Sequence, residues 1–210
     1  MTLHIDIISD VICPWCFIGK RRLEKAINAH DGLVKVRWLP FQLNPQMPKE
    51  GVSRKEYRTK KFGSWARSQE LDAQMVAVGE TEGIHFAFDR TERTPNTLDA
   101  HRLIWLADQQ GVQDAVVEAM FRAYFTDGRD ISNRQTLIDV VAEAGLDRSK
   151  AEAVLNNDDG LEAIKESGEM ARRFRVEGVP FFIINGKITL GGAQPPEAFL
   201  EAFRQVVGGE

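Results

Sequence analysis

The sequence has few cysteines, no long apolar run and no marked excess of charge of one sign. Its 210 residues include two cysteines, and 27 Lys plus Arg residues oppose 31 Asp plus Glu residues, which gives a formal net charge of −4. This balance excludes the strong positive field with which many proteins bind nucleic acid or an anionic membrane surface. Because no stretch of about 18 consecutive apolar residues occurs, the sequence also predicts no transmembrane helix. We therefore expect partners to be recognised through local chemistry rather than through net charge.

The amino-terminal segment lacks the pattern of a secretory leader. Residues 1–16, MTLHIDIISDVICPWC, contain no basic stretch followed by a continuous apolar run and a small-residue cleavage site. The expected location is therefore cytoplasmic, in a reducing compartment where structural disulfides are rare. Two residues separate the two cysteines, Cys13 and Cys16. In such a compartment a Cys-x-x-Cys pair indicates redox or metal chemistry.

The start of the chain is patterned as a strand, a helix and a second strand. The apolar, β-branched run at 3–8 predicts the first strand, and the alternation at 34–38 predicts the second, which Pro40 ends. Between them, Pro14 suits the first turn of a helix, and this places Cys13 at the N-cap. The opening segment is therefore predicted to be a β-α-β unit.

The middle of the chain is predicted to be helical, and the end returns to strands. From about 53 to about 175, apolar residues recur at helical spacing, and 53–56 has the pattern of a capping box. The apolar runs at 181–184 and 187–190 flank an Asn-Gly turn, which predicts a hairpin, and a helical pattern follows at 195–207. The sequence thus predicts an α/β fold whose β-α-β and β-β-α units are separated by a long all-helical insertion.

Cys13 and Cys16 occupy the positions that thiol–disulfide chemistry requires. Only a thiolate attacks a disulfide, and the free N–H groups and partial positive charge of a helix N-terminus stabilise that anion. We therefore predict that Cys13 attacks and that Cys16, about one turn further along, resolves the mixed disulfide. Pro14 stiffens the first turn, and Trp15 presents an aromatic edge beside the sulfur, so both are predicted to contact the substrate.

The helix that carries the motif also carries cations. Lys20, Arg21 and Lys25 are expected on its solvent-exposed side. Lys20, Arg21 and Arg22 are expected to add a weak positive potential near the thiolate.

A metal site is the main alternative reading of the two cysteines. A structural zinc ion usually takes four ligands, and the chain has no second cysteine pair. The histidines are scattered along the chain, at His4, His30, His85 and His101. We therefore favour redox chemistry and predict no metal.

Four segments of the chain resemble the FrnE branch of the DsbA-like thioredoxin superfamily. They are DVICPWCFIG at 10–19, PNTLDAHRL at 95–103, GVPFFI at 178–183 and GGAQ at 191–194. The resemblance implies a thioredoxin fold in one DsbA-like domain spanning 1–210. Its thioredoxin part would comprise about 1–45 and 175–210, with the helical insertion at about 53–175.

The same resemblance implies a function and its partners. It implies disulfide oxidoreductase or isomerase activity on protein or small-molecule disulfides and thiols, without a bound cofactor. Glutathione is a candidate co-substrate. The oligomeric state stays open, with a homodimer as one alternative.

The resemblance also implies roles for residues outside the motif. In this superfamily the Val179–Pro180 bond would be cis and would face the active-site sulfurs, and Val179 would pair its backbone with the substrate. Relatives carry a buried acid six residues before the first cysteine, where this chain has Ile7. The neighbouring Asp6 and Asp10 lie off that position, so a carboxylate-assisted step is not predicted.

Asn96 and His101 are candidate accessory residues because they belong to the second matching segment. The alternative for Asn96 is a helix cap, and for His101 a satisfied contact between helices. The sequence leaves both readings open.

Two other classes of function are weighed against the oxidoreductase. The first is a glutathione-dependent isomerase or transferase that resembles 2-hydroxychromene-2-carboxylate isomerase and the kappa-class transferases, which typically place a serine where Cys13 stands. The second is a binding module or chaperone without catalysis. The presence of both cysteines favours the oxidoreductase over either alternative.

Overall fold

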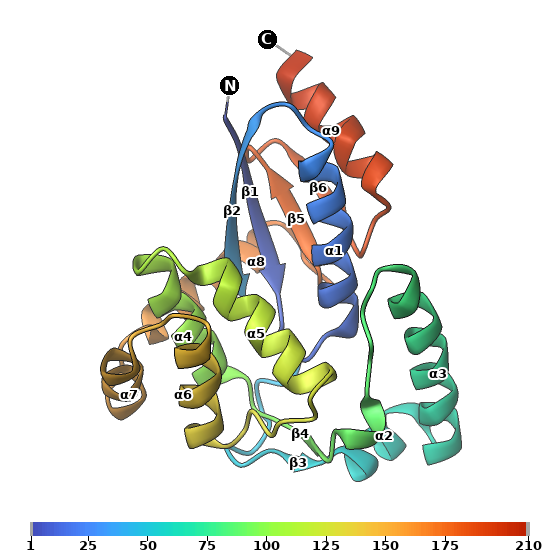
Figure 1. Ribbon diagram of the computed structural model, residues 1–210, viewed down its shortest axis with the longest axis vertical. Coiled ribbons are helices and arrows are strands. Elements are labelled where there is room, and N and C mark those ends of the chain that lie inside the picture. The colour runs from blue at the N-terminus through green and yellow to red at the C-terminus, as the bar shows by residue number, and fades with distance from the viewer. Residues whose placement is uncertain (1, 209–210) are drawn as a thin grey trace.

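The computed structural model describes residues 2–208 and contains a four-stranded sheet with the order β2-β1-β5-β6 (Figure 1). The central strand β1 (Thr2–Ser9) runs parallel to β2 (Leu33–Pro40) and antiparallel to β5 (Phe181–Ile184). The edge strand β6 (Ile188–Gly191) completes the hairpin with β5. Strands from the two ends of the chain therefore form one sheet, as the β-α-β and β-β-α units predicted.

Helices cover both faces of this sheet. Figure 1 shows α1 (Pro14–Asn28) beside α9 (Pro196–Gly208), whereas α8 (Leu161–Arg173) lies behind the strands. On the face of α1 and α9, the rings of Phe182 and Phe199 meet edge to face, with centroids 4.8 Å apart. The two termini lie together at the end of the molecule away from the insertion (Figure 1).

The alternation of side chains along the strands explains why both faces can be covered. Ile7 and Phe182 belong to the main core on the side of α1, while their neighbours Ile8 and Ile183 belong to a smaller cluster with Ala171 of α8. Successive residues of a strand point to opposite faces, so an apolar run without alternation produces a sheet that is buried on both sides.

The insertion consists mainly of helices. It begins with α2 (Arg54–Phe62) and ends with α8, and Figure 1 places α2 and α3 on one side of the lower half and α4 to α7 on the other. The intervening helices are α3 (Trp65–Thr81), α4 (Leu98–Gln109), α5 (Gln113–Phe125), α6 (Arg134–Glu143) and α7 (Arg148–Asn156).

One feature corrects the prediction of an all-helical insertion. A short antiparallel pair joins β3 (Val52–Ser53) to β4 (Arg93–Thr94). Gly51 permits this approach, because a Cβ atom there would lie 2.6 Å from the carbonyl oxygen of Thr94. Two residues per strand carry too little periodicity to be recognised in a sequence.

The amino-terminal end of α1 points into the insertion (Figure 1). The first helical turn therefore lies between the sheet and the helices that the insertion supplies. No helix within residues 2–208 has both the length and the apolar character needed to cross a membrane.

We predict that Gly19→Ala lowers the free energy of unfolding by about 1 to 3 kcal/mol, because it overpacks a filled site. A Cβ atom at Gly19 would lie 2.9 Å from Cγ of Pro180 and 3.2 Å from Cζ of Phe182. Urea unfolding followed by circular dichroism measures the change.

Gly168→Ala is the matched control, because Gly168 lies in α8 and its Cβ position has no neighbour within 4 Å. There the better helix propensity of alanine should raise the free energy of unfolding by up to about 1 kcal/mol. Equal effects of the two substitutions would contradict the proposed packing of α1 against Pro180.

Candidate active site

Cys13 and Cys16 lie at the start of α1. Cys13 is the N-cap residue, with extended backbone angles (φ −94°, ψ 112°), and Pro14 opens the helix, so the predicted placement is confirmed. Both cysteines are free thiols. Cys13 is 6% exposed and Cys16 is fully buried, whereas Trp15 between them is 42% exposed. Cys13 is thus the more accessible sulfur, beside an exposed aromatic ring.

The environment makes the two thiols unequal acids. A hydrogen bond from the Cys16 side chain lowers the pKa of Cys13, and the backbone N–H groups of Cys16 and Trp15 act in the same direction against the effect of burial. Burial raises the pKa of Cys16 well above its usual value, and the hydrogen bond and charge of Cys13 raise it further. Cys13 is therefore the sulfur that ionises first, as the helix position predicts.

The cations of α1 do not supply the positive potential expected from the sequence. Lys20 is only 3% exposed, which corrects its predicted place on the outer side of the helix. Its burial is offset by carboxylates from α1 and α5, which neutralise its charge locally. The ion pairs are Lys20 with Glu24 and Asp114, Arg21 with Glu24 and Glu118, and Arg22 with Glu82. The low pKa of Cys13 therefore depends on the helix end and on Cys16.

The loop before β5 lies against the attacking sulfur. The Val179–Pro180 peptide bond is cis, which confirms that prediction. The Cys13 thiol donates a hydrogen bond to the carbonyl oxygen of Val179, with 3.4 Å between Sγ and O. A substrate bound at Cys13 would therefore have the backbone of Val179 within reach.

Asp10 is a buried carboxylate beside the motif that sequence reasoning set aside. Its Oδ2 accepts a hydrogen bond from the Leu43 N–H (2.7 Å), and its Oδ1 lies 3.3 Å from Nε2 of His101. Its own carbonyl oxygen accepts from the Cys13 N–H at 3.0 Å. The negative charge of Asp10 raises the pKa of Cys13, in opposition to Cys16. Asp10 thus limits the acidity of the thiol.

Asn96 and His101 both fasten the loop that follows β2. His101 Nε2 lies 3.0 Å from the Phe41 carbonyl oxygen, and the side-chain amide of Asn96 donates to the Met47 carbonyl oxygen at 2.7 Å. Asn96 also accepts from the Leu98 N–H at the start of α4, so the capping alternative describes part of its role. Neither side chain lines the cavity beside Cys13. Both side chains therefore contact the 41–47 loop and not the cavity, and their accessory role stays a prediction.

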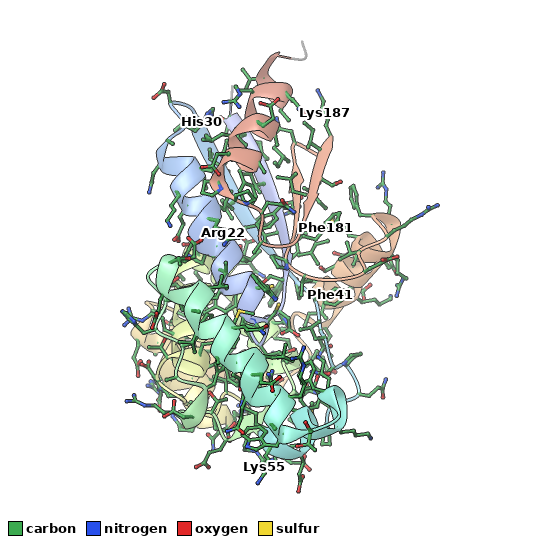
Figure 2. All side chains as sticks on the ribbon, turned by 90° about the vertical axis from the view of Figure 1, so that its right-hand side faces the viewer. Arg22, His30, Phe41, Lys55, Phe181 and Lys187 are labelled. Carbon is green, nitrogen blue, oxygen red and sulfur yellow. The ribbon has the colours of Figure 1, made fainter. Side chains whose placement is uncertain are left out.

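A cavity of about 500 Å³ opens beside Cys13. The Cys13–Cys16 motif forms one wall of the cavity, and α2 and α3 form another. In Figure 2, α3 faces the viewer in front of the N-terminal end of α1. The cavity lining combines apolar side chains with a small polar set. The apolar residues include Ile12, Trp15, Leu43, Phe62, Leu71, Met75, Val78 and Phe88, and the polar set includes Arg54, Tyr57, Arg58, Lys61 and Asp72.

Sequence reasoning predicted Cys13, Pro14 and Trp15 but missed the cavity residues that come from outside the motif. The capping box at Ser53 correctly placed the start of α2, where the Ser53 hydroxyl accepts from the Glu56 N–H. The spacing of Arg54 and Arg58 puts them on one face of that helix. Nothing in the sequence indicated that this face turns toward Cys13, because the approach is set by the tertiary fold. Within residues 2–208, no group of three or more His, Cys, Asp and Glu side chains is arranged to hold a metal ion.

Comparisons with known proteins match almost the whole chain. Residues 4–204 match the DSBA-like thioredoxin domain. The crystal structure of a probable DsbA oxidoreductase from Streptomyces coelicolor has a TM-score of 0.91 and 31% identity, with 99% of this chain and 91% of that chain covered. The Bacillus subtilis (strain 168) protein YwbO is 29% identical over 211 residues, which cover 97% of this chain and 96% of YwbO.

A more distant structure shares the fold alone. The cytosolic disulfide reductase DsbM from Pseudomonas aeruginosa, in a structure with GSH, has a TM-score of 0.68 and 22% identity, with 98% of this chain and 100% of that chain covered. The predicted thioredoxin fold is confirmed by these matches. None of them carries the name of the FrnE branch, so that finer assignment stays a prediction.

We predict that iodoacetamide alkylates Cys13 and leaves Cys16 unmodified at neutral pH. The rate should rise with pH through a pKa below the free-thiol value of about 8.5. In Cys16→Ala the rise should move to higher pH, because the main hydrogen bond that stabilises the Cys13 thiolate is gone. Mass spectrometry of the labelled peptides measures both results. Faster labelling of Cys16 would reverse the assigned roles.

We predict that Asp10→Asn lowers the pKa of Cys13, because the charge that raises it is removed. It should also reduce the free energy of unfolding by about 1 to 3 kcal/mol, since a buried hydrogen-bonded carboxylate is altered. Thiolate absorbance in the ultraviolet, followed against pH, measures the pKa. Asp6→Asn is the control, because Asp6 of β1 pairs with the half-exposed Arg37 of the neighbouring strand β2. A Cys13 pKa that is unchanged in Asp10→Asn would contradict the role given to Asp10.

Proposed function

The chain belongs to the DSBA-like thioredoxin domain family, and we propose that it is a thiol–disulfide oxidoreductase that works through Cys13 and Cys16. The observation that carries the proposal is the inequality of the two thiols: an N-cap sulfur on a residue that is 6% exposed, with a lowered pKa, and a fully buried one with a raised pKa. This is the division of labour that two-step disulfide exchange requires.

In the first step the Cys13 thiolate attacks one sulfur of a substrate disulfide. A bond forms between Cys13 and that sulfur, the substrate disulfide breaks, and the other substrate sulfur leaves as a thiolate. We assign Val179 the role of pairing its backbone with an extended substrate, because its carbonyl oxygen already lies 3.4 Å from the Cys13 sulfur. Pro14 and Trp15 line the cavity beside Cys13 and are assigned to contact the substrate. Pro180 is buried beside Gly19, so its contact with the substrate stays a prediction.

In the second step Cys16 attacks the sulfur of Cys13. The charge and the hydrogen bond of the Cys13 thiolate both raise the pKa of Cys16, and both are absent once Cys13 is in a mixed disulfide. Cys16 therefore becomes more acidic when it has to act. Its proton passes to the departing substrate thiolate, the Cys13–Cys16 disulfide forms, and the substrate has gained two electrons that the dithiol has lost.

Glutathione is the co-substrate that we propose for the return to the dithiol. Two molecules of glutathione would reduce the Cys13–Cys16 disulfide and become one glutathione disulfide, which balances the two electrons. The fold shared with a disulfide reductase whose structure includes GSH supports this choice. Isomerisation needs no co-substrate, because a second thiol of the substrate can attack the mixed disulfide and release Cys13 unchanged.

We propose the cytoplasm as the location. The small number of cysteines fits a reducing compartment, and the DsbM neighbour is named as a cytosolic protein.

The glutathione-dependent isomerase or transferase is separated from this function by Cys13. Such an enzyme needs one group that activates glutathione and has no use for a resolving thiol. Full activity of Cys13→Ser with glutathione would favour it over the oxidoreductase.

We predict that Cys16→Ser accumulates mixed disulfides with substrates, whereas Cys13→Ser does not. The first variant can attack but cannot release its product, and the second retains only the buried thiol. The yield of adducts should differ by about tenfold or more, because attack requires an accessible thiolate. Non-reducing gels with and without dithiothreitol, followed by mass spectrometry, give the measurement.

The double variant Cys13→Ala/Cys16→Ala is the control for adducts that form without the motif, since the chain has no other cysteine. Similar adduct yields in the two single variants would contradict the proposed order of attack.

A further inference from the structure

The cavity beside Cys13 has an excess of positive charge. Three cations line it, namely Arg54, Arg58 and Lys61, and Asp72 is the one acidic residue in its lining. The two oxygens of Asp72 accept hydrogen bonds from Nη2 of Arg54 (2.8 Å) and from Nη2 of Arg58 (2.7 Å). Lys61 instead donates to the hydroxyl of Tyr57 at 3.1 Å. A single carboxylate therefore pairs with the guanidinium groups of the buried Arg54 and the partly buried Arg58, and the ammonium group of Lys61 has a neutral partner.

This excess is unusual because the side chains of the two arginines have little exposure to solvent. The side chain of Arg54 is 5% exposed and that of Arg58 is 18% exposed. Aromatic rings compensate in part, with the guanidinium carbon of Arg54 5.1 Å from the centre of the Phe88 ring and that of Arg58 4.7 Å from the centre of the Phe62 ring. Burial, with the neighbouring charge of Arg54 in addition, lowers the pKa of Arg58. Cations gathered in such a place favour an anion.

Part of the donor capacity of these groups is unused. Among residues 2–208, Nη1 of Arg58 and Nη1 of Arg54 make no hydrogen bond, although a guanidinium group has five N–H donors. Both side chains line the cavity. A carboxylate that entered the cavity would meet donors that the protein leaves free.

The remaining lining suits an apolar body of limited size. Leu71, Met75 and Val78 of α3 contribute aliphatic surface, and Trp15 contributes an aromatic one. A cavity of about 500 Å³ lies within the range of small-molecule sites, roughly 300 to 1,000 Å³. Cys13 belongs to the same lining, so a molecule bound there has the attacking sulfur beside it.

We propose that this cavity binds a small disulfide or thiol that has an apolar body and a carboxylate, and that Arg58 and Lys61 bind the carboxylate. The proposal rests on the proposed function and names the class of its substrate. Arg58 lies inside the cavity, Lys61 is solvent-exposed, and both come from α2. Arg54 instead donates a hydrogen bond to Asp72 and packs against the ring of Phe88.

The reaction on such a substrate is the exchange already described. The Cys13 thiolate forms a bond with the nearer sulfur of the bound disulfide, and the farther sulfur leaves as a thiolate. Cys16 then closes the Cys13–Cys16 disulfide and releases the second thiol. The small disulfide takes up two electrons, the dithiol supplies them, and no further reagent is needed.

The test compares two aromatic disulfides that differ in charge. Dithiobis(nitrobenzoate) has a carboxylate on each ring, and dithiodipyridine is uncharged at pH 8. The fully reduced protein is mixed with each in a stopped-flow instrument, and mercaptoethanol serves as a reference thiol without a cavity. We expect the anionic-to-neutral ratio of rate constants to be about tenfold higher for the protein than for mercaptoethanol, the size of a buried charge-assisted contact.

Substitutions then assign this preference to named residues. Arg58→Gln should lower the ratio about fivefold and Lys61→Gln about twofold, because an exposed cation contributes less. Arg67→Gln and Lys55→Gln are the matched controls and should leave the ratio unchanged. Arg67 pairs with Glu70 on α3 outside the cavity, and Lys55 lies at the outer end of the molecule (Figure 2).

Alkylation by iodoacetamide, which is small and uncharged, reports on Cys13 itself. If Arg58→Gln slows alkylation and both disulfides equally, Arg58 acts on the thiolate and the proposal is overturned. The proposal also fails if the wild-type protein reacts with both disulfides in the same ratio as mercaptoethanol. Alkylation of Cys13 without reaction toward either disulfide would instead refute the proposed oxidoreductase function.

A second measurement needs only the wild-type protein, so it decides the matter even if the variants do not fold. Nitrobenzoate, which has the carboxylate but no sulfur, should slow the reaction with dithiodipyridine in a saturable manner. The uncharged nitrobenzamide should not. Equal inhibition by the two compounds, or none by nitrobenzoate, would show that the cavity does not select an anion.

Discussion

The mutual influence of the Cys13 and Cys16 thiols at the start of α1, which shifts their pKa values in opposite directions, is the interaction on which the chemistry of this site depends. The Cys16 side chain is the largest influence that lowers the pKa of Cys13, and the Cys13 side chain helps to raise the pKa of Cys16. One contact therefore separates the two acidities. It can do so because Cys13 is the N-cap of α1 and the first helical turn brings Cys16 back toward it, with the Cys16 N–H donating to the Cys13 carbonyl oxygen at 3.0 Å. The cations of α1 are committed to ion pairs with neighbouring carboxylates and add little to this balance.

A second constraint is the hydrogen-bond network that connects the motif to the loop at 41–47. Asp10 accepts from the Leu43 N–H and lies beside His101, which in turn lies beside the Phe41 carbonyl oxygen. Asn96 fixes the far end of the same loop. Leu43 is part of the cavity wall, so a polar network buried behind the motif determines where that wall stands. The cost of leaving any member of such a network without a partner makes the arrangement rigid.

Sequence reasoning reached the fold and the sulfurs because both depend on local signals. The apolar runs without alternation, the Asn-Gly turn and the proline after Cys13 each predicted an element that the structure contains. It failed where a residue's role depends on a distant partner. Lys20 has the sequence position of an exposed residue and is buried because α5 brings Asp114 and Glu118 to it. Asp10 was given no role because relatives carry their buried acid six residues before the first cysteine, where this chain has Ile7.

The insertion explains how one redox motif could serve a selected set of substrates. The cysteines, α1 and the Val179–Pro180 loop supply exchange chemistry, and none of them distinguishes one disulfide from another by charge. The wall that could do so comes from α2 and α3, whose cations exceed the single carboxylate that faces them. Since α2 and α3 line the cavity without contributing a strand to the four-stranded sheet, their lining could change while the dithiol stays the same. Selectivity and reactivity would then reside in separate parts of the chain, joined only where Cys13 enters the cavity.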